Sequence, residues 1–406
     1  MNLKLHKSTV NLISKIKITG SKSESNRLIL LQVLYPEIKI KNLSNSDDSK
    51  LMLRALQFSQ GKIDIHHAGT AMRFLSAYFS TQDEKEIVLT GSSRMQERPI
   101  QILIEALQQL GADIVYEKNL GYPPLKIKGK TLTKNKVTLR ANVSSQYISA
   151  LLLIAPKLKN GLELTLEGKI TSVPYIKMTL SLLNEIGVNT SFNNNIIKVE
   201  PKLQIIKSKT FTVESDWSSA SYFYSIVALS PLNTEIVLSY YKVNSLQGDS
   251  VLAEIYNEFG VQTTFEKNSI TLKKFDKNLS PKTFNLSNAP DIAQTITVTC
   301  LGLGIECFLS GLHTLKIKET DRLLALKTEI EKIGGNIKIT ESTLKLSSLK
   351  ILKSNVEIAT YNDHRMAMAF APLALKTTIV IKDANVVSKS YPDFWNDLKL
   401  VGFQFS

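Results

Sequence analysis

One local pattern recurs along the chain: an amphipathic helix that ends at a glycine and is followed by a strand-like run. The glycines that end these segments are Gly111, Gly187, Gly260, Gly334 and Gly402, spaced by 76, 73, 74 and 68 residues. Apolar residues at i, i+3, i+4 and i+7 give each helix one buried face. A period of about 70 residues is too long for a solenoid unit and instead predicts an α/β module. With a shorter first copy around Gly61, the module occurs six times.

A second kind of helix is expected between these copies. It is apolar over most of its circumference and should therefore be buried. Pro372 should kink or end the last of these helices. Three modules in each half place the boundary between two domains near residues 210–216. The predicted buried helices lie within residues 25–34, 71–79, 144–156, 218–229 and 364–375.

Composition narrows the class of protein. The 406 residues are 43% hydrophobic and 21% charged, which excludes a disordered chain. The net charge of +14 favours anionic partners such as nucleic acid, acidic lipid or small phosphorylated molecules. Cys300 and Cys307 share an apolar run and match no metal spacing, so we expect two buried thiols in a reducing compartment. Because a signal core and an apolar run of about 18–20 residues are missing, the sequence predicts a soluble, cytoplasmic protein.

Arginine is used sparingly and in particular places. Of the 50 basic residues, 42 are Lys and eight are Arg. A planar guanidinium binds carboxylate or phosphate through two parallel bonds, which Lys cannot do. Cations are unfavourable in the first turn of a helix, so their repeated use there indicates an anion-binding cleft. The alternative is that each Arg pairs with a neighbouring carboxylate of Glu24, Glu97, Asp321 or Asp363. The six arginines at strand–loop–helix junctions are Arg27, Arg73, Arg94, Arg98, Arg322 and Arg365.

Several helix starts can be predicted from these junctions. Ser21 followed by Glu24 fits a capping box. Gly69 would let a ligand approach the backbone closely. The other predicted starts are Thr70 as a cap, Pro99 as the first helical residue, Ser144 or Ser145 as a cap, and Asn362 or Asp363 as a cap.

Familiar cofactor motifs are missing from the sequence. There is no G-x-x-x-x-G-K-[ST] loop, and the GLGIEC segment at Gly302 lacks the third glycine of a dinucleotide fingerprint. His66 and His67 would point to opposite sides of a strand, without a third ligand nearby. The sequence therefore lacks these two nucleotide-binding motifs, and the spacing of the histidines does not favour a metal site.

Taken in order, a set of short motifs resembles the EPSP synthase (3-phosphoshikimate 1-carboxyvinyltransferase) family. The motifs are SKSESNR, AGTAMR, RMQERP, SSQ, SVPYIKMT, DWSSASYF, KETDR, YNDHRMAM and SKSYPDFW, and the resemblance runs from about Ile16 to the C-terminus. It implies a two-domain inside-out α/β barrel with three βαβαββ repeats in each domain and the active site in the interdomain cleft. Residues 20–214 would form the shikimate 3-phosphate domain. Residues 1–19 and 215–406 would form the domain with the catalytic carboxylates and most phosphoenolpyruvate ligands.

The resemblance also implies the reaction and the role of each residue. The enolpyruvyl group of phosphoenolpyruvate would move to the 5-hydroxyl of shikimate 3-phosphate, with phosphate leaving. Asp291 would act as the base, Glu319 would protonate the methylene carbon, and Lys22 would touch both substrates. Shikimate 3-phosphate would be held by Ser23, Arg27, Ser144, Ser145, Gln146, Ser172 and Tyr175, and its ring hydroxyls by Asp291, Thr314 and Lys318. Phosphoenolpyruvate would be held by Gly69, Arg94, Arg322, Arg365 and Lys389, with Arg73 in support. The implied protein is a monomer without a cofactor, nucleic acid or membrane partner.

The sequence departs from the family at a few places near this site. His66 and His67 stand where the family usually has Gly-Asn, Phe74 where it often has Pro, and Thr314 where it often has Asn. These changes bear on the shape of the pocket and on the response to glyphosate. They leave the charged groups in place.

Three other functions fit these residues less well. The sister enolpyruvyl transferase that acts on UDP-N-acetylglucosamine typically has a reactive Cys in the loop matching SSRMQERP, whereas this chain has no Cys before Cys300. A nucleic-acid-binding protein would place its arginines along one face rather than at helix entrances. An inactive relative would not need Lys22, Asp291 and Glu319 together.

Overall fold

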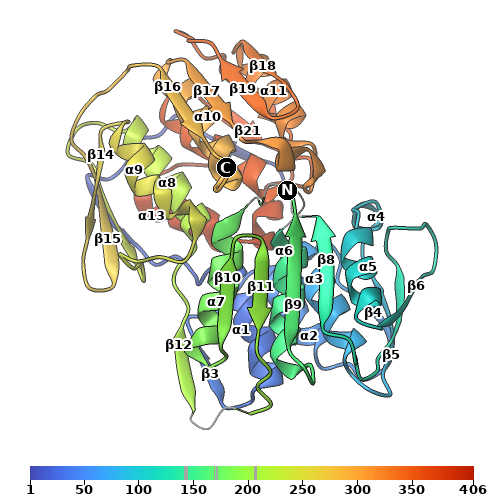
Figure 1. Ribbon diagram of the computed structural model, residues 1–406. Coiled ribbons are helices and arrows are strands. Elements are labelled where there is room, and N and C mark those ends of the chain that lie inside the picture. Colours follow the sequence, from blue (N-terminus) through green and yellow to red (C-terminus); the bar gives the residue numbers. More distant parts are fainter. Residues whose placement is uncertain (141–144, 169, 171, 205–207) are drawn as a thin grey trace. The chain divides into compact units, whose positions relative to one another are not determined.

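The chain folds into two compact units in the computed structural model, which describes residues 1–140, 145–168, 170, 172–204 and 208–406. Residues Ser21–Val213 form one unit, here called the continuous unit. Residues Met1–Gly20 and Glu214–Ser406 form the other, here called the discontinuous unit. Figure 1 shows the elements of both units, coloured along the sequence.

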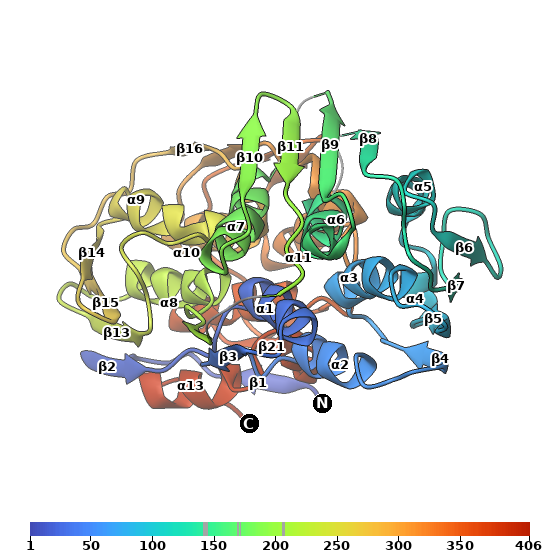
Figure 2. The same ribbon diagram turned by 60° about the horizontal axis from the view of Figure 1, so that its bottom comes forward.

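Three helices form the inside of the continuous unit. They are α1 (Lys22–Leu34), α3 (Gly69–Ser80) and α6 (Ser145–Ile154). All three contact one another, and every residue of α3 is buried. Figure 2 shows these helices inward of the strands of the same unit. Because they are apolar on most sides, burial is the expected outcome, and the predicted buried helices are confirmed here.

The strands of the continuous unit form three sheets. They are β3 (Ile38–Lys41), β4 (Gly61–Asp64), β5 (Glu86–Thr90), β6 (Asp113–Tyr116), β7 (Leu125–Lys128), β8 (Lys136–Arg140), β9 (Leu162–Glu167), β10 (Thr190–Asn193), β11 (Ile196–Val199) and β12 (Lys209–Thr212). The sheet orders are β4-β5-β7-β6, β10-β11-β9-β8 and β12-β3. In both four-stranded sheets the two strands joined by a buried helix are parallel and the other neighbours are antiparallel.

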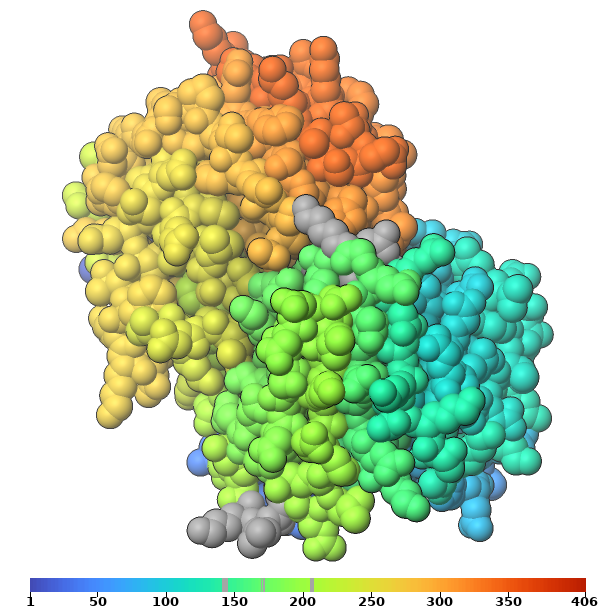
Figure 3. Space-filling model, in the orientation of Figure 1, coloured from blue at the N-terminus to red at the C-terminus, as the bar shows by residue number. Residues whose placement is uncertain are grey.

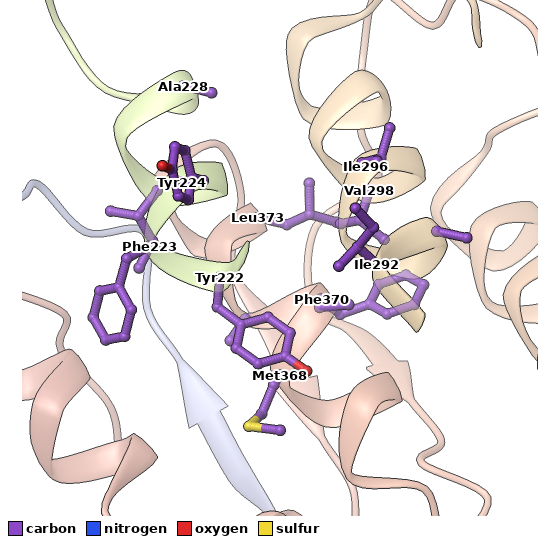
Figure 4. Packing of buried hydrophobic residues seen from close by; sticks show 14 of the residues in the cluster. Tyr222, Phe223, Tyr224, Ala228, Ile292, Ile296, Val298, Met368, Phe370 and Leu373 are labelled. Carbon is purple, nitrogen blue, oxygen red and sulfur yellow. The ribbon is translucent and has the colours of Figure 1, made fainter. Parts of the chain in front are cut away.

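The discontinuous unit has the same plan around its own buried helices. These are α8 (Trp217–Leu229), α10 (Ala293–Leu303) and α12 (His364–Phe370). α10 contacts both α8 and α12. The buried hydrophobic core of this unit includes Tyr222, Phe223, Tyr224, Ile292, Ile296, Met368, Phe370 and Leu373 (Figure 4).

The strands of the discontinuous unit also form three sheets. They are β1 (Leu3–Leu5), β2 (Ile13–Ile16), β13 (Glu235–Ser239), β14 (Val261–Phe265), β15 (Ser269–Lys274), β16 (Lys282–Asn285), β17 (Cys307–Ser310), β18 (Ile337–Ile339), β19 (Thr343–Leu346), β20 (Val356–Ile358) and β21 (Ile379–Ile381). The sheet orders are β14-β15-β13-β2, β16-β17-β19-β18 and β1-β21-β20. The turn between β14 and β15 projects from the surface (Figure 3), and its Glu266, Lys267 and Asn268 are exposed.

Two strands are exchanged where the chain passes between the units. β2 is followed by α1 and β3, and β12 is followed by α8 and β13. A crossover helix ordinarily joins two parallel strands of one sheet. Here β13 pairs in parallel with β2, and β12 pairs in parallel with β3. This exchange explains why the first 20 residues pack with the second half of the chain.

A second set of helices, each with both buried and solvent-exposed residues, carries the recurring pattern seen in the sequence. These are α2 (Asp47–Ala55), α5 (Gln101–Gln109), α7 (Val173–Glu185), α9 (Leu252–Asn257), α11 (Arg322–Ile333) and α13 (Phe394–Val401). The five predicted helix-ending glycines all have positive φ, which confirms their role: Gly111, Gly187, Gly260, Gly334 and Gly402.

The remaining helical elements are short. They are α4 (Ser93–Gln96) and the 3-10 helices η1 (Ala155–Lys157), η2 (Gly248–Val251), η3 (Pro290–Ile292), η4 (His313–Ile317), η5 (Ala371–Leu375) and η6 (Ala384–Lys389). Pro372 lies in η5, directly after α12, so the predicted early end of this helix is confirmed. Across the described residues, no helix has both the length and the apolar character needed to cross a membrane.

Candidate active site

Arg322 lies at the centre of a network of charged side chains in the discontinuous unit. It is the first residue of α11 and is only 2% exposed. Its Nε donates to Asp363 Oδ2 at 2.6 Å, and its Nη1 donates to Asp291 Oδ1 at 2.9 Å. Its Nη2 donates to Glu319 Oε2 at 2.8 Å. Burial would lower the pKa of Arg322, but the three carboxylates outweigh burial and raise it.

Three cations surround the carboxylate of Asp291, which lies in η3. Besides Arg322, Arg365 Nη2 approaches Asp291 Oδ2 to 3.3 Å and Lys318 Nζ approaches Oδ1 to 3.4 Å. Burial alone would raise the pKa of Asp291, but Arg365, Lys318 and Arg322 together hold it well below its usual range. Asp291 is therefore ionised in the protein as it stands.

A chain of polar contacts continues from Arg365 into the interior of the discontinuous unit. Arg365 Nη1 donates to the carbonyl oxygen of Asp291 at 2.9 Å, and its Nη2 donates to Ser218 Oγ at 3.3 Å. Ser218 Oγ in turn donates to Asp249 Oδ2. Burial, reinforced by the charge of Asp291, raises the pKa of Asp249 to about 6.

Other predicted residues of this unit lie at the edge of the network or apart from it. Burial lowers the pKa of Lys318, and the negative charge of Asp291 offsets only part of this lowering. Thr314 is buried in η4, and its Oγ1 makes no hydrogen bond within the described part of the chain. Lys389 Nζ donates to the carbonyl oxygen of Asn362 at 2.6 Å.

In the continuous unit, Arg27 is buried among neutral oxygen atoms. Its Nε donates to Thr179 Oγ1 and its Nη2 to Ser149 Oγ, both at 2.8 Å. The carbonyl oxygens of Ser23 and Tyr175 accept from its two Nη atoms at 2.7 and 3.3 Å. Burial lowers the pKa of Arg27 to about 10. None of these four acceptors carries a charge. Tyr175 and the nearby carboxylate of Glu24 only partly offset the lowering of the pKa of Arg27 by burial.

The start of α3 brings together Gly69 and two further arginines. Arg73 Nη1 donates to the carbonyl oxygen of Gly69 at 3.2 Å, and its Nη2 donates to that of Pro99 at 2.9 Å. The guanidinium of Arg98 lies directly against Gly69, since a Cβ added to Gly69 would be 2.6 Å from Arg98 Nη1. Arg73 of AGTAMR and Arg98 of RMQERP therefore both lie at the N-terminus of α3.

The other predicted residues of the continuous unit are more scattered. Lys22 Nζ is 3.9 Å from Asp48 Oδ2 at the start of α1. Gln146 Nε2 donates to Thr70 Oγ1 at 3.3 Å. Arg94 is largely exposed and pairs with Glu97 at 3.0 Å, as the simple ion-pair alternative expected.

Two serines complete the predicted set on this side. Ser145 is buried at the start of α6, whereas the predicted Ser144 lies outside the described residues. Ser172 precedes α7 in a left-handed conformation with φ 54°. That conformation is costly for a residue with a side chain, and such strain is often found at functional sites.

Some local predictions at helix starts were wrong. Ser21 precedes α1, but its hydroxyl makes no capping bond, so the capping box with Glu24 does not form. Ala68 rather than Thr70 precedes α3, because the helix already starts at Gly69. Pro99 lies two residues before the start of α5 at Gln101. Asp363, by contrast, caps α12 by accepting from the backbone N–H of Arg365 at 2.9 Å, as predicted.

Sequence reasoning missed several groups that complete these networks. Asp363 was expected only as a cap or as a partner of Arg365, yet it also binds Arg322. Asp321, the expected partner of Arg322, instead caps α11. Ser149 and Thr179 hold Arg27. Ser149 lies about one helical turn beyond the SSQ motif, and Thr179 is the last residue of SVPYIKMT, a motif in which only Ser172 and Tyr175 were expected to bind substrate.

Comparison with known proteins agrees with the geometry. The sequence profile of the family described as EPSP synthase (3-phosphoshikimate 1-carboxyvinyltransferase) matches residues 57–398. The chain is 47% identical over 393 residues to the 3-phosphoshikimate 1-carboxyvinyltransferase of Bacteroides fragilis, covering 96% of this chain and 95% of the relative. It is 35% identical over 419 residues to that of Haemophilus influenzae, covering 95% and 96%.

Solved structures show the same fold. EPSP synthase from Acinetobacter baumannii superimposes with a TM-score of 0.80 at 20% identity, covering 100% of this chain and 99% of that one. The enolpyruvyl transferase NikO from Streptomyces tendae gives 0.76 at 11% identity, covering 100% and 98%. These matches confirm the predicted α/β fold built from repeated βαβαββ units. On the evidence of its sequence matches, the chain belongs to the EPSP synthase family of enolpyruvyl transferases.

Proposed function

We propose that this chain transfers the enolpyruvyl group of phosphoenolpyruvate to the 5-hydroxyl of shikimate 3-phosphate and releases phosphate. The family match and the curated relatives named 3-phosphoshikimate 1-carboxyvinyltransferase support this activity. One structural observation carries the proposal: the two carboxylates that the chemistry needs, Asp291 and Glu319, are bound to the same guanidinium of Arg322.

In the proposed reaction, the 5-hydroxyl oxygen of shikimate 3-phosphate attacks C2 of phosphoenolpyruvate while Asp291 takes its proton. Glu319 gives a proton to the methylene carbon, which becomes a methyl group. The tetrahedral adduct then returns a proton from that methyl group to Glu319 as the bond between C2 and the phosphate oxygen breaks. The proton held by Asp291 leaves with the phosphate, so both carboxyl groups regain their starting states. Proton movements and charge stabilisation are sufficient for this transfer, so we propose that no metal or organic cofactor takes part.

The electrostatics of Asp291 suggest how its basicity is controlled. A carboxylate with a strongly depressed pKa is a poor base. The cations that depress it, Arg365, Lys318 and Arg322, are also those proposed to bind substrates. Substrate anions would share these cations, weaken their hold on Asp291 and raise its pKa. Asp291 would therefore become an effective base only when the site is occupied.

We propose that the continuous unit supplies the site for the phosphate of shikimate 3-phosphate. Arg27 supports this, because its buried guanidinium is held by neutral oxygens and has no carboxylate among its hydrogen-bond acceptors. The proposed companions, from the motifs named above, are Lys22, Ser23, Ser144, Ser145, Gln146, Ser172 and Tyr175.

We further propose that the protein acts as a monomer in the cytoplasm. The two cysteines, Cys300 and Cys307, are free and buried, which fits a reducing compartment. Its partners would be the two anionic substrates.

Phosphate release tests the proposed activity. The purified chain is mixed with phosphoenolpyruvate, with shikimate 3-phosphate, or with both, and inorganic phosphate is followed continuously. Phosphate should appear only when both substrates are present. No release in the presence of both would refute the activity.

A further inference from the structure

The guanidinium of Arg98 is buried against the N-terminus of α3. Arg98 is only 8% exposed. Its Nη1, Cζ and Nη2 would lie 2.6, 3.1 and 3.1 Å from a Cβ added to Gly69. These three distances show that the terminal nitrogens of the guanidinium lie directly against the first residue of the helix. Only a glycine leaves room for this approach.

Arg98 differs from the other buried arginines in that its guanidinium makes no hydrogen bond to any described residue. Its Nε is buried without a hydrogen bond, and none of the described residues forms a hydrogen bond or ion pair with its guanidinium. Arg322, by contrast, binds three carboxylates, and Arg27 donates to four oxygen atoms. A buried and unpaired charge is costly for the folded protein.

The surroundings make this position still less favourable for a cation. The first N–H groups of a helix have no partner within the helix and carry positive partial charge. Arg73, a second guanidinium, donates to the carbonyl oxygen of Gly69. The neighbouring carboxylate of Glu97 is paired with Arg94. Helix N–H groups and a second guanidinium therefore lie close to the guanidinium of Arg98.

The backbone that carries Arg98 is firmly held. The carbonyl oxygen of Pro99 accepts from Arg73 Nη2 at 2.9 Å and from the Tyr147 hydroxyl at 2.5 Å. The backbone N–H of Arg98 donates to the carbonyl oxygen of Met95 at 3.1 Å. A group fixed in this way loses little entropy when it binds a ligand.

We propose that Arg98, together with the N–H groups at the start of α3, binds an anionic group of phosphoenolpyruvate. The missing counter-charge is then supplied by the substrate, as a phosphate or carboxylate oxygen. This inference rests on the proposed function and adds Arg98 to the residues that bind this substrate. It also assigns Gly69 a role: it leaves space for the guanidinium.

The first test compares steady-state kinetics of Arg98→Gln, Arg98→Lys and the wild-type chain. Loss of a charge-assisted hydrogen bond to an anion should raise KM for phosphoenolpyruvate on the order of tenfold to a hundredfold in Arg98→Gln. KM for shikimate 3-phosphate should stay within about twofold, as expected of a residue that contacts only one substrate. KM for phosphoenolpyruvate in Arg98→Lys should lie between the values for the wild type and Arg98→Gln. Lys keeps the positive charge but cannot form the two parallel hydrogen bonds of a guanidinium. Arg54→Gln, at an exposed position of α2 in the same unit, is the matched control and should behave as wild type.

The second test needs no turnover, so it separates this inference from the proposed function. Thermal unfolding is followed with and without millimolar inorganic phosphate, with chloride keeping the ionic strength constant. Phosphate should stabilise the wild type and Arg54→Gln more than Arg98→Gln. Without phosphate, Arg98→Gln should be at least as stable as the wild type, because it removes an unpaired buried charge.

Several results would overturn the inference. An unchanged KM for phosphoenolpyruvate in Arg98→Gln would do so, as would a selective rise in KM for shikimate 3-phosphate. Equal stabilisation of Arg98→Gln and wild type by phosphate would also count against it. A ligand-free Arg98→Gln protein that unfolds at a clearly lower temperature would show that Arg98 has a structural role instead.

Discussion

Asp291 and Glu319 share Arg322, so at the scale of single residues the two carboxylates can be distinguished only by changing one of them. In Glu319→Gln, the amide oxygen can still accept a hydrogen bond from Arg322, but the side chain can no longer deliver a proton. Turnover should fall by a factor on the order of 1000 or more, as expected for loss of a general acid. Binding of shikimate 3-phosphate, measured by calorimetry, should change by less than about twofold. Loss of that binding would instead indicate that Glu319 maintains the structure around Arg322.

The raised pKa of Asp249 leads to a separate prediction about how the stability of the protein depends on pH. Its pKa is raised from 3.8 to about 6, first by burial and then by Asp291. The folded protein therefore holds this proton more tightly than the unfolded chain, and stability falls as pH rises from about 4 to about 6. The loss amounts to about 3 kcal/mol when the full shift is converted. The amide side chain of Asp249→Asn cannot ionise, so this variant does not lose stability in this way. Its free energy of unfolding minus that of the wild type should therefore increase as pH rises from about 4 to about 6.

Urea unfolding at about pH 4, 5, 6 and 7 measures the difference in free energy of unfolding between Asp249→Asn and the wild type. These pH values span the titration of Asp249. Both tryptophans, Trp217 and Trp395, lie in the same unit as Asp249, so their fluorescence reports on the unfolding of that unit. Asp113→Asn, at an exposed position of β6, controls for the loss of one carboxylate. A pH-independent difference between Asp249→Asn and wild type would contradict the assignment.

At the scale of the elements, two helix-ending glycines form a matched pair. Gly260 follows α9 with φ +73°, and an added Cβ would lie 2.0 Å from the carbonyl oxygen of Asp276. Gly334 follows α11 with φ +102°, and the nearest contact of its Cβ would be an ordinary 3.6 Å to Lys353. Both Ala substitutions carry the cost of a left-handed residue, about 1–2 kcal/mol. Gly260→Ala should cost at least about 2 kcal/mol more, because a backbone atom must move.

The comparison is made by urea unfolding of the two variants under identical conditions. Both glycines lie in the discontinuous unit, so the same tryptophan signal applies to both. Equal losses of stability would mean that the backbone around Asp276 adapts without cost. That result would contradict the close packing at the end of α9.

Local pattern predicted most helices but not all of them. The helices that carry the recurring pattern were predictable because each has a single apolar stripe and a glycine just after its end. α10 was not predicted as a helix, since its sequence is apolar throughout and rich in β-branched residues. In the structure, Thr297 and Thr299 turn their hydroxyls back onto the carbonyl oxygens of Ala293 and Thr295 at 2.8 and 2.7 Å. Tertiary packing, rather than local preference, makes this segment helical.

Contacts between strands and side chains that lie far apart in the sequence could not be predicted either. The exchange of β2 and β12 depends on contacts about 200 residues apart, which no periodicity reveals. In the same way, motifs predicted that Arg322 and Asp291 matter, but not that three carboxylates from separate loops converge on one guanidinium. The roles of the individual residues in catalysis stay predictions.

At the scale of the whole molecule, charge is the property that fits the proposed substrates. The chain carries a net charge of +14, and both proposed substrates are anions. Within the discontinuous unit, however, the cations Lys318, Arg322 and Arg365 are already paired with carboxylates. The net positive charge would therefore aid encounter with the substrates, whereas selectivity depends on how these local pairs rearrange around them.

The most direct test of the account is a competition between two acceptors. The chain is supplied with phosphoenolpyruvate and equal amounts of shikimate 3-phosphate and UDP-N-acetylglucosamine, and the products are identified by mass spectrometry. We expect the enolpyruvyl group on shikimate 3-phosphate alone, with one phosphate released for each product molecule. Enolpyruvyl-UDP-N-acetylglucosamine as the product, or no product from either acceptor, would contradict the account.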